Sequence, residues 1–210
     1  MKTHIFLIRH CESVWNSDTP EDRFNGRTDI PLSQHGVLQS MRLAKYFSDK
    51  NVSLVYSSPL KRASTTGSQI ASKLDCDVVI SKTLTEIDFG DWEGLTIRQI
   101  EDKYSILFTT WTQDPATNKP PSGESGYELA SRVLPFFWEI ANKHENETIV
   151  VVGHKVVNRI ILCHCLGISI SLFRKTIPQR VGAINLIVTE QNVVDSISLL
   201  DDLSYLALES

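Results

Sequence analysis

Two short apolar runs in the chain each end in a histidine. Residues 5–8 are all apolar and lead directly into Arg9 and His10, and the run at residues 148–152 leads through a glycine into His154. Such short runs predict strands buried on both faces, as in a parallel sheet covered by helices. One run alone could equally precede a surface turn. Because ligands bind at the carboxyl ends of strands in these sheets, two runs favour a shared site.

The rest of the pattern alternates between strands and helices. Strands are predicted at residues 54–57, 77–81, 183–189 and 193–200, and helices at residues 33–47, 58–74, 125–140 and 155–166. The last two strands are separated by a tight turn, so they must pair antiparallel. We therefore predict a three-layer α/β sandwich with a mostly parallel central sheet, one antiparallel edge strand and helices on both faces. Residues 103–123 contain three prolines, which predicts an irregular segment that caps the site.

Length and charge narrow the class of protein. The 210 residues fit a single domain, 1–210, and the net charge of −4 argues against nucleic-acid or membrane partners. No apolar run reaches membrane-spanning length and no signal region precedes the first strand, so we expect a cytoplasmic protein. The four cysteines show no disulfide-framework spacing, as expected in a reducing compartment.

Two further polar positions are candidates for chemistry. Arg62 falls in the first turn of a predicted helix, where free N–H groups attract anions, although a solvated surface arginine is the alternative. Glu86 is followed by several large apolar residues, which can raise the pKa of its carboxyl and let it donate a proton. Asp88, Asp91 and Glu93 are competing carboxyls that the local pattern does not exclude.

Four stretches together resemble a known family. They are Arg-His-Cys-Glu at residues 9–12, Leu-Lys-Arg-Ala-Ser-Thr-Thr at 60–66, Glu86 ahead of Gly-Asp-Trp-Glu-Gly at 90–94, and Gly-His at 153–154. In this order they resemble the histidine phosphatase superfamily, also called the phosphoglycerate mutase-like family. The resemblance covers residues 4 to 160, and its one plain departure is Cys11, where the family usually has glycine.

The resemblance implies a role for each matching residue. His10 becomes the nucleophile that forms a phosphohistidine, Glu86 protonates the leaving oxygen, and three residues neutralise the phosphoryl oxygens, namely Arg9, Arg62 and His154. Four more positions are expected to bind substrate: Asn16, Asn25, Gly26 and Lys155. The long polar loop at residues 17–31 leaves the predicted site directly, so we expect it to form a wall of the pocket. No metal and no cofactor are expected.

Three functions remain open at this stage. The first is a metal-independent hydrolase of a small phosphorylated metabolite, and the second is a phosphoglycerate mutase that uses the same intermediate. The third is an inactive member of the family that only binds phosphate groups. The separation of Glu86 and His154, 154 − 86 = 68 positions, is short for a glycolytic mutase of this family. The resemblance is therefore to the small phosphatase branch, which includes α-ribazole phosphatases and metal-independent phosphoserine phosphatases. The sequence does not decide whether the protein is a homodimer.

Cys11 has two interpretations. Its place beside the nucleophile and near two cations favours a thiolate, which would make the enzyme sensitive to oxidation. The alternative is a small buried residue that fills the position of the family's glycine.

Overall fold

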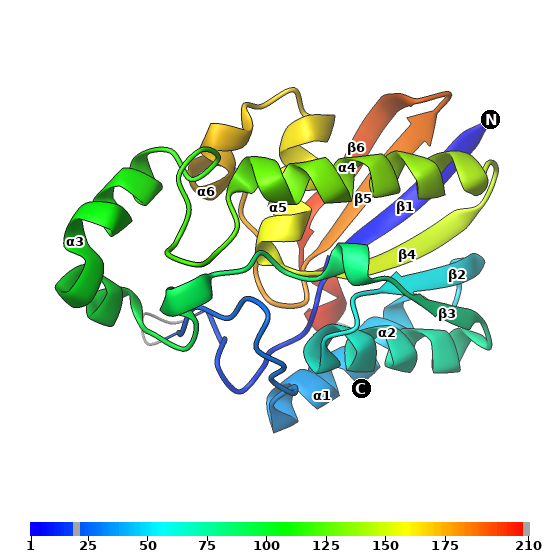
Figure 1. The fold of residues 1–210 in the computed structure, drawn as a ribbon. Helices are drawn as coiled ribbons and strands as arrows, with labels where there is room; N and C mark the ends of the chain where they lie inside the picture. The colour runs from blue at the N-terminus through cyan, green and yellow to red at the C-terminus, as the bar shows by residue number, and fades with distance from the viewer. Residues whose placement is uncertain (19–21, 208–210) are drawn as a thin grey trace.

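The computed structural model describes residues 1–18 and 22–207. The strands are β1 (Lys2–Arg9), β2 (Val52–Ser57), β3 (Asp77–Ile80), β4 (Thr148–Gly153), β5 (Ile184–Glu190) and β6 (Val193–Asp202). The α-helices are α1 (Gln34–Tyr46), α2 (Lys61–Leu74), α3 (Ile97–Gln113), α4 (Gly126–Lys143), α5 (Lys155–Cys165) and α6 (Phe173–Thr176). Figure 1 shows the strands side by side in the centre, with α4 and α5 on one side and α1 and α2 on the other.

The strands form one mixed sheet in the order β3–β2–β4–β1–β5–β6. The first four strands are mutually parallel, whereas β5 pairs antiparallel with both β1 and β6. Gln191 and Asn192 both have positive φ, as two-residue hairpin turns require, and they turn the chain between β5 and β6. The predicted α/β class is thereby confirmed. The strand that runs against the others is β5, one position in from the edge strand β6.

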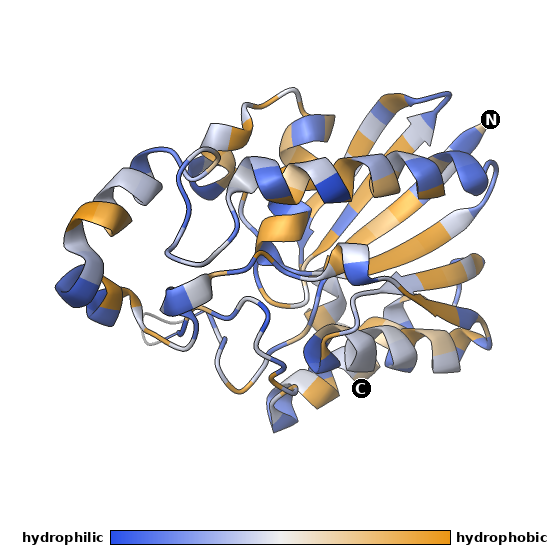
Figure 2. Cartoon of the chain, in the orientation of Figure 1, coloured by the Kyte–Doolittle hydropathy of each residue, from blue (hydrophilic) through white to orange (hydrophobic). Residues whose placement is uncertain are grey.

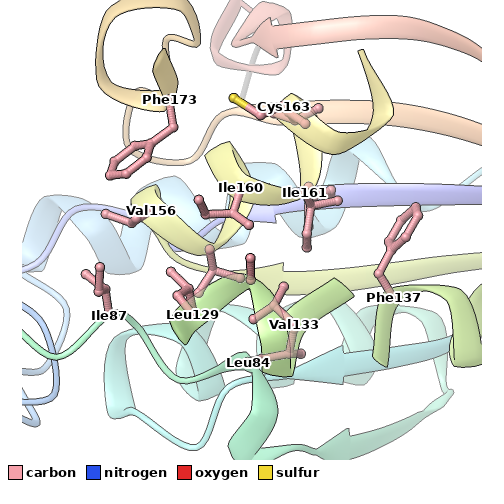
Figure 3. Close-up of a cluster of buried hydrophobic side chains, with 14 of the residues drawn as sticks. Leu84, Ile87, Leu129, Val133, Phe137, Val156, Ile160, Ile161, Cys163 and Phe173 are labelled. Carbon is pink, nitrogen blue, oxygen red and sulfur yellow. The ribbon is translucent and has the colours of Figure 1, made fainter. Parts of the chain in front are cut away.

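The apolar strand residues are buried on both faces of the sheet. Ile5 and Leu7 of β1 pack into one core with α4 and α5, and Phe6 and Ile8 pack into a second core with α1 and α2. Figure 2 shows this hydrophobic character along the central strands. Figure 3 shows part of the first core, in which side chains of α4 and α5 face one another. The unbroken apolar runs in the sequence follow from this two-sided burial.

The register of β1 and β4 brings the two histidines together. Arg9 at the end of β1 lies opposite Gly153 at the end of β4, so that the following residues, His10 and His154, leave the sheet side by side. His154 is also the N-cap of α5, which begins directly after it. The predicted meeting of the two histidines at one sheet edge is correct.

One segment differs from the prediction. Residues 97–113 are helical as α3, although residues 103–123 were expected to be irregular. Thr96 and Gln99 form a reciprocal capping box that starts this helix, and all three prolines of the segment follow its end. The backbone is non-helical only at Tyr104, where the helix is kinked. The predicted cap is therefore mostly a helix, whose Trp111 reaches the pocket described below.

No helix within residues 1–18 and 22–207 has the length and apolar character needed to cross a membrane.

Candidate active site

His10 lies buried beyond the end of β1, with 3% of its surface exposed. Its Nδ1 is 2.7 Å from the carbonyl oxygen of Cys11. Because a carbonyl oxygen can only accept, Nδ1 carries the proton and Nε2 keeps a free lone pair. Burial, together with the charges of Arg62 and Arg9, lowers the pKa of His10 well below its usual 6.5. The ring is therefore neutral near pH 7 and has the tautomer that a nucleophile needs.

Among the described residues, the guanidinium of Arg9 forms hydrogen bonds through its Nη1 atom only. Its Nη1 donates to Asp18 Oδ1 at 2.8 Å and to the carbonyl oxygen of Gln179 at 2.7 Å. Its Nε is buried and has no hydrogen-bond partner among the described residues. Asp18 also accepts the N–H of Val181, so its carboxylate links the loop after β1 to the chain ahead of β5. The second residue to contact Arg9, Gln179, carried no signal in the sequence that would have pointed to the site.

Arg62 is completely buried in the first turn of α2. Its Nη1 donates to the carbonyl oxygen of Thr28 at 2.9 Å, and its Nη2 donates to that of Gly26 at 2.6 Å. Its Nε, like that of Arg9, has no partner in the part of the chain that the structure describes. Burial is the main reason why the pKa of Arg62 falls to about 10, which still leaves it charged near neutral pH.

His154 lies against His10, with ring centroids 5.1 Å apart and planes at 60°. Its Nε2 is 2.7 Å from Ser58 Oγ, whereas its buried Nδ1 has no partner among the described residues. Burial and the neighbouring charge of Arg62 lower the pKa of His154 well below 6.5. Buried polar atoms are normally paired, so unpartnered nitrogens of Arg9, Arg62 and His154 around one imidazole indicate an anion-binding centre.

Glu86 is buried at the amino end of α5. Its Oε2 accepts the N–H of Val156 at 3.0 Å, and its Oε1 accepts those of Ile87 at 2.9 Å and Val157 at 3.2 Å. Burial raises the pKa of Glu86, although these three N–H groups and Arg62 act in the opposite direction. Two N–H groups in the first turn of α5, those of Val156 and Val157, are thus bonded to Glu86.

The predicted substrate-binding residues fall into two groups. Asn16, Asn25 and Lys155 line a cavity of about 310 Å³ that also contains Arg9, His10 and Glu86. Gly26 does not line it. Its carbonyl oxygen holds the guanidinium of Arg62, so its contribution to the site is indirect.

The competing carboxyls of the acidic turn lie outside this cavity. Glu93 accepts the N–H groups of Arg27 and Thr28, and Asp88 pairs with Arg27 at 3.1 Å. Both carboxyls therefore brace the loop that carries the partners of Arg62. Asp91 does not line the cavity either. Glu86 is thus the member of this group that lines the cavity together with His10.

Comparison with known proteins agrees with this geometry. The family model of the histidine phosphatase superfamily (branch 1) matches residues 5–201. The chain belongs to the histidine phosphatase superfamily. Phosphoserine phosphatase 1 of Hydrogenobacter thermophilus is 36% identical over 169 residues, which cover 80% of this chain and 79% of that protein.

Solved structures show the same histidine phosphatase fold. YhfR of Bacillus stearothermophilus superposes with a TM-score of 0.88 at 27% identity and covers 97% of this chain and 98% of its own. A putative α-ribazole-5′-P phosphatase of Escherichia coli has a TM-score of 0.83 at 25% identity, with 95% of this chain and 96% of its own covered. The family and these relatives establish the protein as a phosphatase.

In this histidine phosphatase, the burial of Cys11 decides between the two interpretations of that residue given in the sequence analysis. Its side chain is fully buried in the core shared by α1 and α2, and burial raises the pKa of its thiol to about 12. The thiolate interpretation is therefore wrong, because desolvation raises the pKa of the thiol more than the hydrogen bond with Thr66 lowers it. The structure supports the alternative, a small residue that packs in place of glycine.

Sequence reasoning missed several cavity residues of this histidine phosphatase. They come from two separate elements and are Arg159 of α5, and Phe173 and Arg174 of α6, whereas Trp111 of α3 lies in the segment that was predicted to cap the site. Arg159 had a weak signal, since it lies four residues after Lys155 and so on the same face of α5. The others had none, because the short α6 carries no periodic pattern.

Proposed function

We propose that this phosphatase is a metal-independent phosphomonoester hydrolase that acts on a small phosphorylated metabolite through a phosphohistidine at His10. The observation that carries the proposal is the state of the His10 ring. Its Nδ1 is fixed as a donor to the Cys11 carbonyl, and its pKa is lowered, so Nε2 is a neutral nucleophile. Arg9 and Arg62 each keep a buried Nε without a hydrogen-bond partner among the described residues, which supports a role for both in binding phosphoryl oxygens.

In the first step, Arg9, Arg62 and His154 bind the non-bridging oxygens of the phosphate group and reduce its repulsion of a nucleophile. The lone pair on Nε2 of His10 forms the N–P bond as the ester P–O bond breaks. Protonated Glu86 gives its proton to the departing alkoxide, and its raised pKa supports this role. The products are an alcohol and a phosphohistidine.

In the second step, Glu86 acts in its ionised form. It removes a proton from a water molecule, whose oxygen bonds to phosphorus as the N–P bond breaks. Inorganic phosphate leaves, His10 regains its lone pair, and Glu86 is again protonated. The charge of Arg9 and Arg62 supplies the neutralisation that a metal ion gives in other phosphatases, which supports a metal-independent reaction.

The identity of the leaving alcohol is the open part of this proposal. The relatives suggest phosphoserine and α-ribazole phosphate as the first compounds to examine. The decisive experiment is a phosphate-release screen over a panel of phosphorylated metabolites, with and without EDTA, and with phosphoglycerate mutase activity assayed in parallel. We expect phosphate release that EDTA leaves unchanged.

Each alternative predicts a different result in that screen. Efficient interconversion of phosphoglycerates with little phosphate release would establish the mutase instead. Binding of phosphorylated compounds without any turnover would identify an inactive phosphate-binding member of the family. Loss of hydrolysis in EDTA, restored by a divalent metal, would contradict metal independence.

A further inference from the structure

The pocket contains more positive charge than one phosphate group requires. Besides Arg9, its wall includes Lys155 and Arg159 of α5 and Arg174 of α6. None of these three side chains contacts His10 through a hydrogen bond in the described structure. We call Lys155, Arg159 and Arg174 the distal cationic wall.

Two members of this wall have no acidic partner. No carboxylate lies within 4.0 Å of the charged groups of Arg159 or Arg174 anywhere in residues 1–18 and 22–207. Lys155 differs, since its Nζ is 3.7 Å from Asp18 Oδ1. Asp22 also lines the cavity, where its carboxylate accepts backbone N–H groups of the loop after β1. Glu86, Asp18 and Asp201 act on Arg159 from beyond this distance, whereas Arg174 is influenced mainly by the positive charge of Arg159. The two arginines therefore lack a carboxylate in direct contact, and Arg174 is the less compensated of the two.

Both arginines are oriented by the protein itself. Arg159 Nε donates to the carbonyl oxygen of Ile177 at 2.6 Å, which leaves its two terminal nitrogens for other acceptors. The guanidinium carbon of Arg174 lies over the Trp111 ring, 4.1 Å from its centroid, a cation–π contact that uses none of the guanidinium's hydrogen-bond donors. Two planar cations fixed in this way are suited to bind a planar or tetrahedral anion through paired hydrogen bonds.

The surroundings of the wall strengthen its attraction for anions. Phe173 and Trp111 are almost completely buried and line the same cavity, so water is partly excluded from it. Burial is the main reason why the pKa of both arginines falls to about 10, and a neighbouring positive charge, that of Arg9 for Arg159 and that of Arg159 for Arg174, contributes to the decrease. A bound anion would relieve this repulsion.

The wall also lies at a short distance from the phosphoryl site. Lys155 lines the same cavity as His10 and is the first residue of α5, directly after His154. Arg159 follows four residues later on the same helix face, where side-chain positions are separated by about 6 Å. A group bound there would belong to the leaving alcohol of a small substrate, a few bonds from the ester oxygen.

We propose that the distal cationic wall is a second anion subsite, and that the substrate is a phosphomonoester whose alcohol carries a further carboxylate or phosphate group. This inference rests on the proposed phosphomonoesterase activity and specifies the substrate class for it. Arg159 and Arg174 bind the second anion, while Arg9 and Arg62 bind the phosphoryl group that is transferred.

The test compares substrates that differ only in the second anion. 3-Phosphoglycerate and glycerol 3-phosphate form one pair, in which a carboxylate is replaced by a hydroxymethyl group. The bisphosphate and monophosphate of 1,3-propanediol form the other. We expect a higher kcat/KM for the anionic member of at least one pair, and the pair that shows it identifies the second group as carboxylate or phosphate.

Two variants on different helices assign that preference to the wall. Arg159→Gln and Arg174→Gln should each reduce the preference by a factor of about 10 to 100, the usual effect of losing a hydrogen bond between charged groups. Arg42→Gln, on the exposed surface of α1, removes the same charge far from the pocket and should keep the native preference. Because the two arginines lie on separate elements, one variant still decides the matter if the other fails to fold, as judged by thermal unfolding.

The outcomes separate this inference from the proposed function. A wild-type enzyme that hydrolyses p-nitrophenyl phosphate but prefers neither anionic substrate would overturn the second subsite alone. A preference that survives in both arginine variants would do the same. Absence of hydrolysis with every phosphomonoester, including p-nitrophenyl phosphate, would instead remove the proposed function.

Discussion

At the scale of single residues, the site depends on atoms whose state is set by their immediate neighbours. The carbonyl oxygen of Cys11 selects the tautomer of His10, and burial keeps that ring neutral. Burial also raises the pKa of Glu86, so that a carboxyl can hold a proton near a neutral imidazole. A proton donor and a nucleophile therefore coexist in one pocket because their environments shift their pKa values in opposite directions.

The first prediction concerns the nucleophile. Because both half-reactions pass through Nε2 of His10, His10→Ala should abolish turnover. Brief incubation of the wild-type enzyme with ³²P-labelled substrate should leave label on the protein that is stable to base and labile to acid. Substantial activity in a folded His10→Ala protein would contradict the mechanism.

The second prediction separates Glu86 from the other carboxyls by the leaving group. Glu86→Gln should lower turnover of an alkyl phosphate by about 10² to 10⁴, the usual contribution of positioned proton transfer. Phosphorylation by p-nitrophenyl phosphate should be much less affected, because nitrophenolate departs without a proton. A burst of nitrophenolate is expected, since water activation still needs the base.

Asp88→Asn is the matched control for this comparison, because Asp88 pairs with Arg27 outside the cavity. Any change in turnover caused by Asp88→Asn should be the same for the alkyl phosphate and for p-nitrophenyl phosphate. If Asp88→Asn showed the selective loss and Glu86→Gln did not, the general acid would have been assigned to the wrong residue.

The third prediction follows from the burial of Cys11. A thiol with a pKa of about 12 and no exposed surface should react slowly with peroxide. Wild-type enzyme and Cys11→Gly should therefore lose activity at equal rates in mild peroxide, measured as residual phosphate release. Protection by Cys11→Gly, together with recovery of the wild type by thiol, would show that the residue is a redox sensor after all.

At the scale of elements, the site is assembled where loops meet the ends of the strands and the first turns of two helices. The first turn of α5 binds Glu86 through two backbone N–H groups, and the first turn of α2 carries Arg62. The loop before α1 supplies the carbonyl oxygens that orient Arg62, among them that of Gly26. The loop and the acidic turn are packed so closely that Gly26 has no room for a side chain.

The fourth prediction tests this loop. A Cβ at Gly26 would overlap the carbonyl oxygen of Ile87 and the carboxylate of Glu93, so the backbone has to move. Gly26→Ala should lower the free energy of unfolding by about 1–3 kcal/mol, the usual cost of overpacking. It should also weaken inhibition by vanadate, because Arg62 loses its alignment. Denaturant unfolding and the vanadate inhibition constant provide the two measurements, and unchanged values for both would show that the loop does not position Arg62.

At the scale of the whole molecule, two imidazoles are buried uncharged just beyond the carboxyl ends of β1 and β4. Their transfer from water to the interior couples folding to pH, since an unfolded chain binds protons at His10 and His154 more readily than the native chain does. Their contribution to stability is fully present above pH 6.5. It is lost as the pH falls from 6.5 towards their lowered pKa values. The pKa of Glu86 is raised, so its contribution to stability is present below pH 4.5 and decreases as the pH rises above that value.

The fifth prediction is that the free energy of unfolding decreases below pH 6.5, by up to about 1.4 kcal/mol per pH unit for each buried histidine. His10→Asn removes one of the two contributions, so the free energy of unfolding should change less steeply with pH below pH 6.5. His4→Asn, at an exposed position of β1, is the control for the same change of side chain outside the site. Denaturant unfolding between pH 5 and pH 8 gives the slopes. Parallel curves for wild type and His10→Asn would show that His10 is not the group responsible.

The sequence by itself determined the α/β class and the core of the site. The apolar runs before Arg9 and Gly153 predict two buried parallel strands, and local periodicity is sufficient to place His10 and His154 at their ends. Ser125 and Glu128 likewise predict the capping box that starts α4. These features depend on residues close together in the chain, whose spacing is visible without any knowledge of packing.

Only the tertiary structure decided which groups meet across long sequence separations. It placed Glu86 against the N–H groups of α5 and made α3 helical up to Gln113. It also brought Arg159 and Arg174 to one wall of the pocket and buried Cys11, whose thiol is kept protonated by desolvation. The physical reason is that partner geometry and desolvation are properties of the packed interior, where segments distant in sequence supply the neighbours that fix each side chain's charge and contacts.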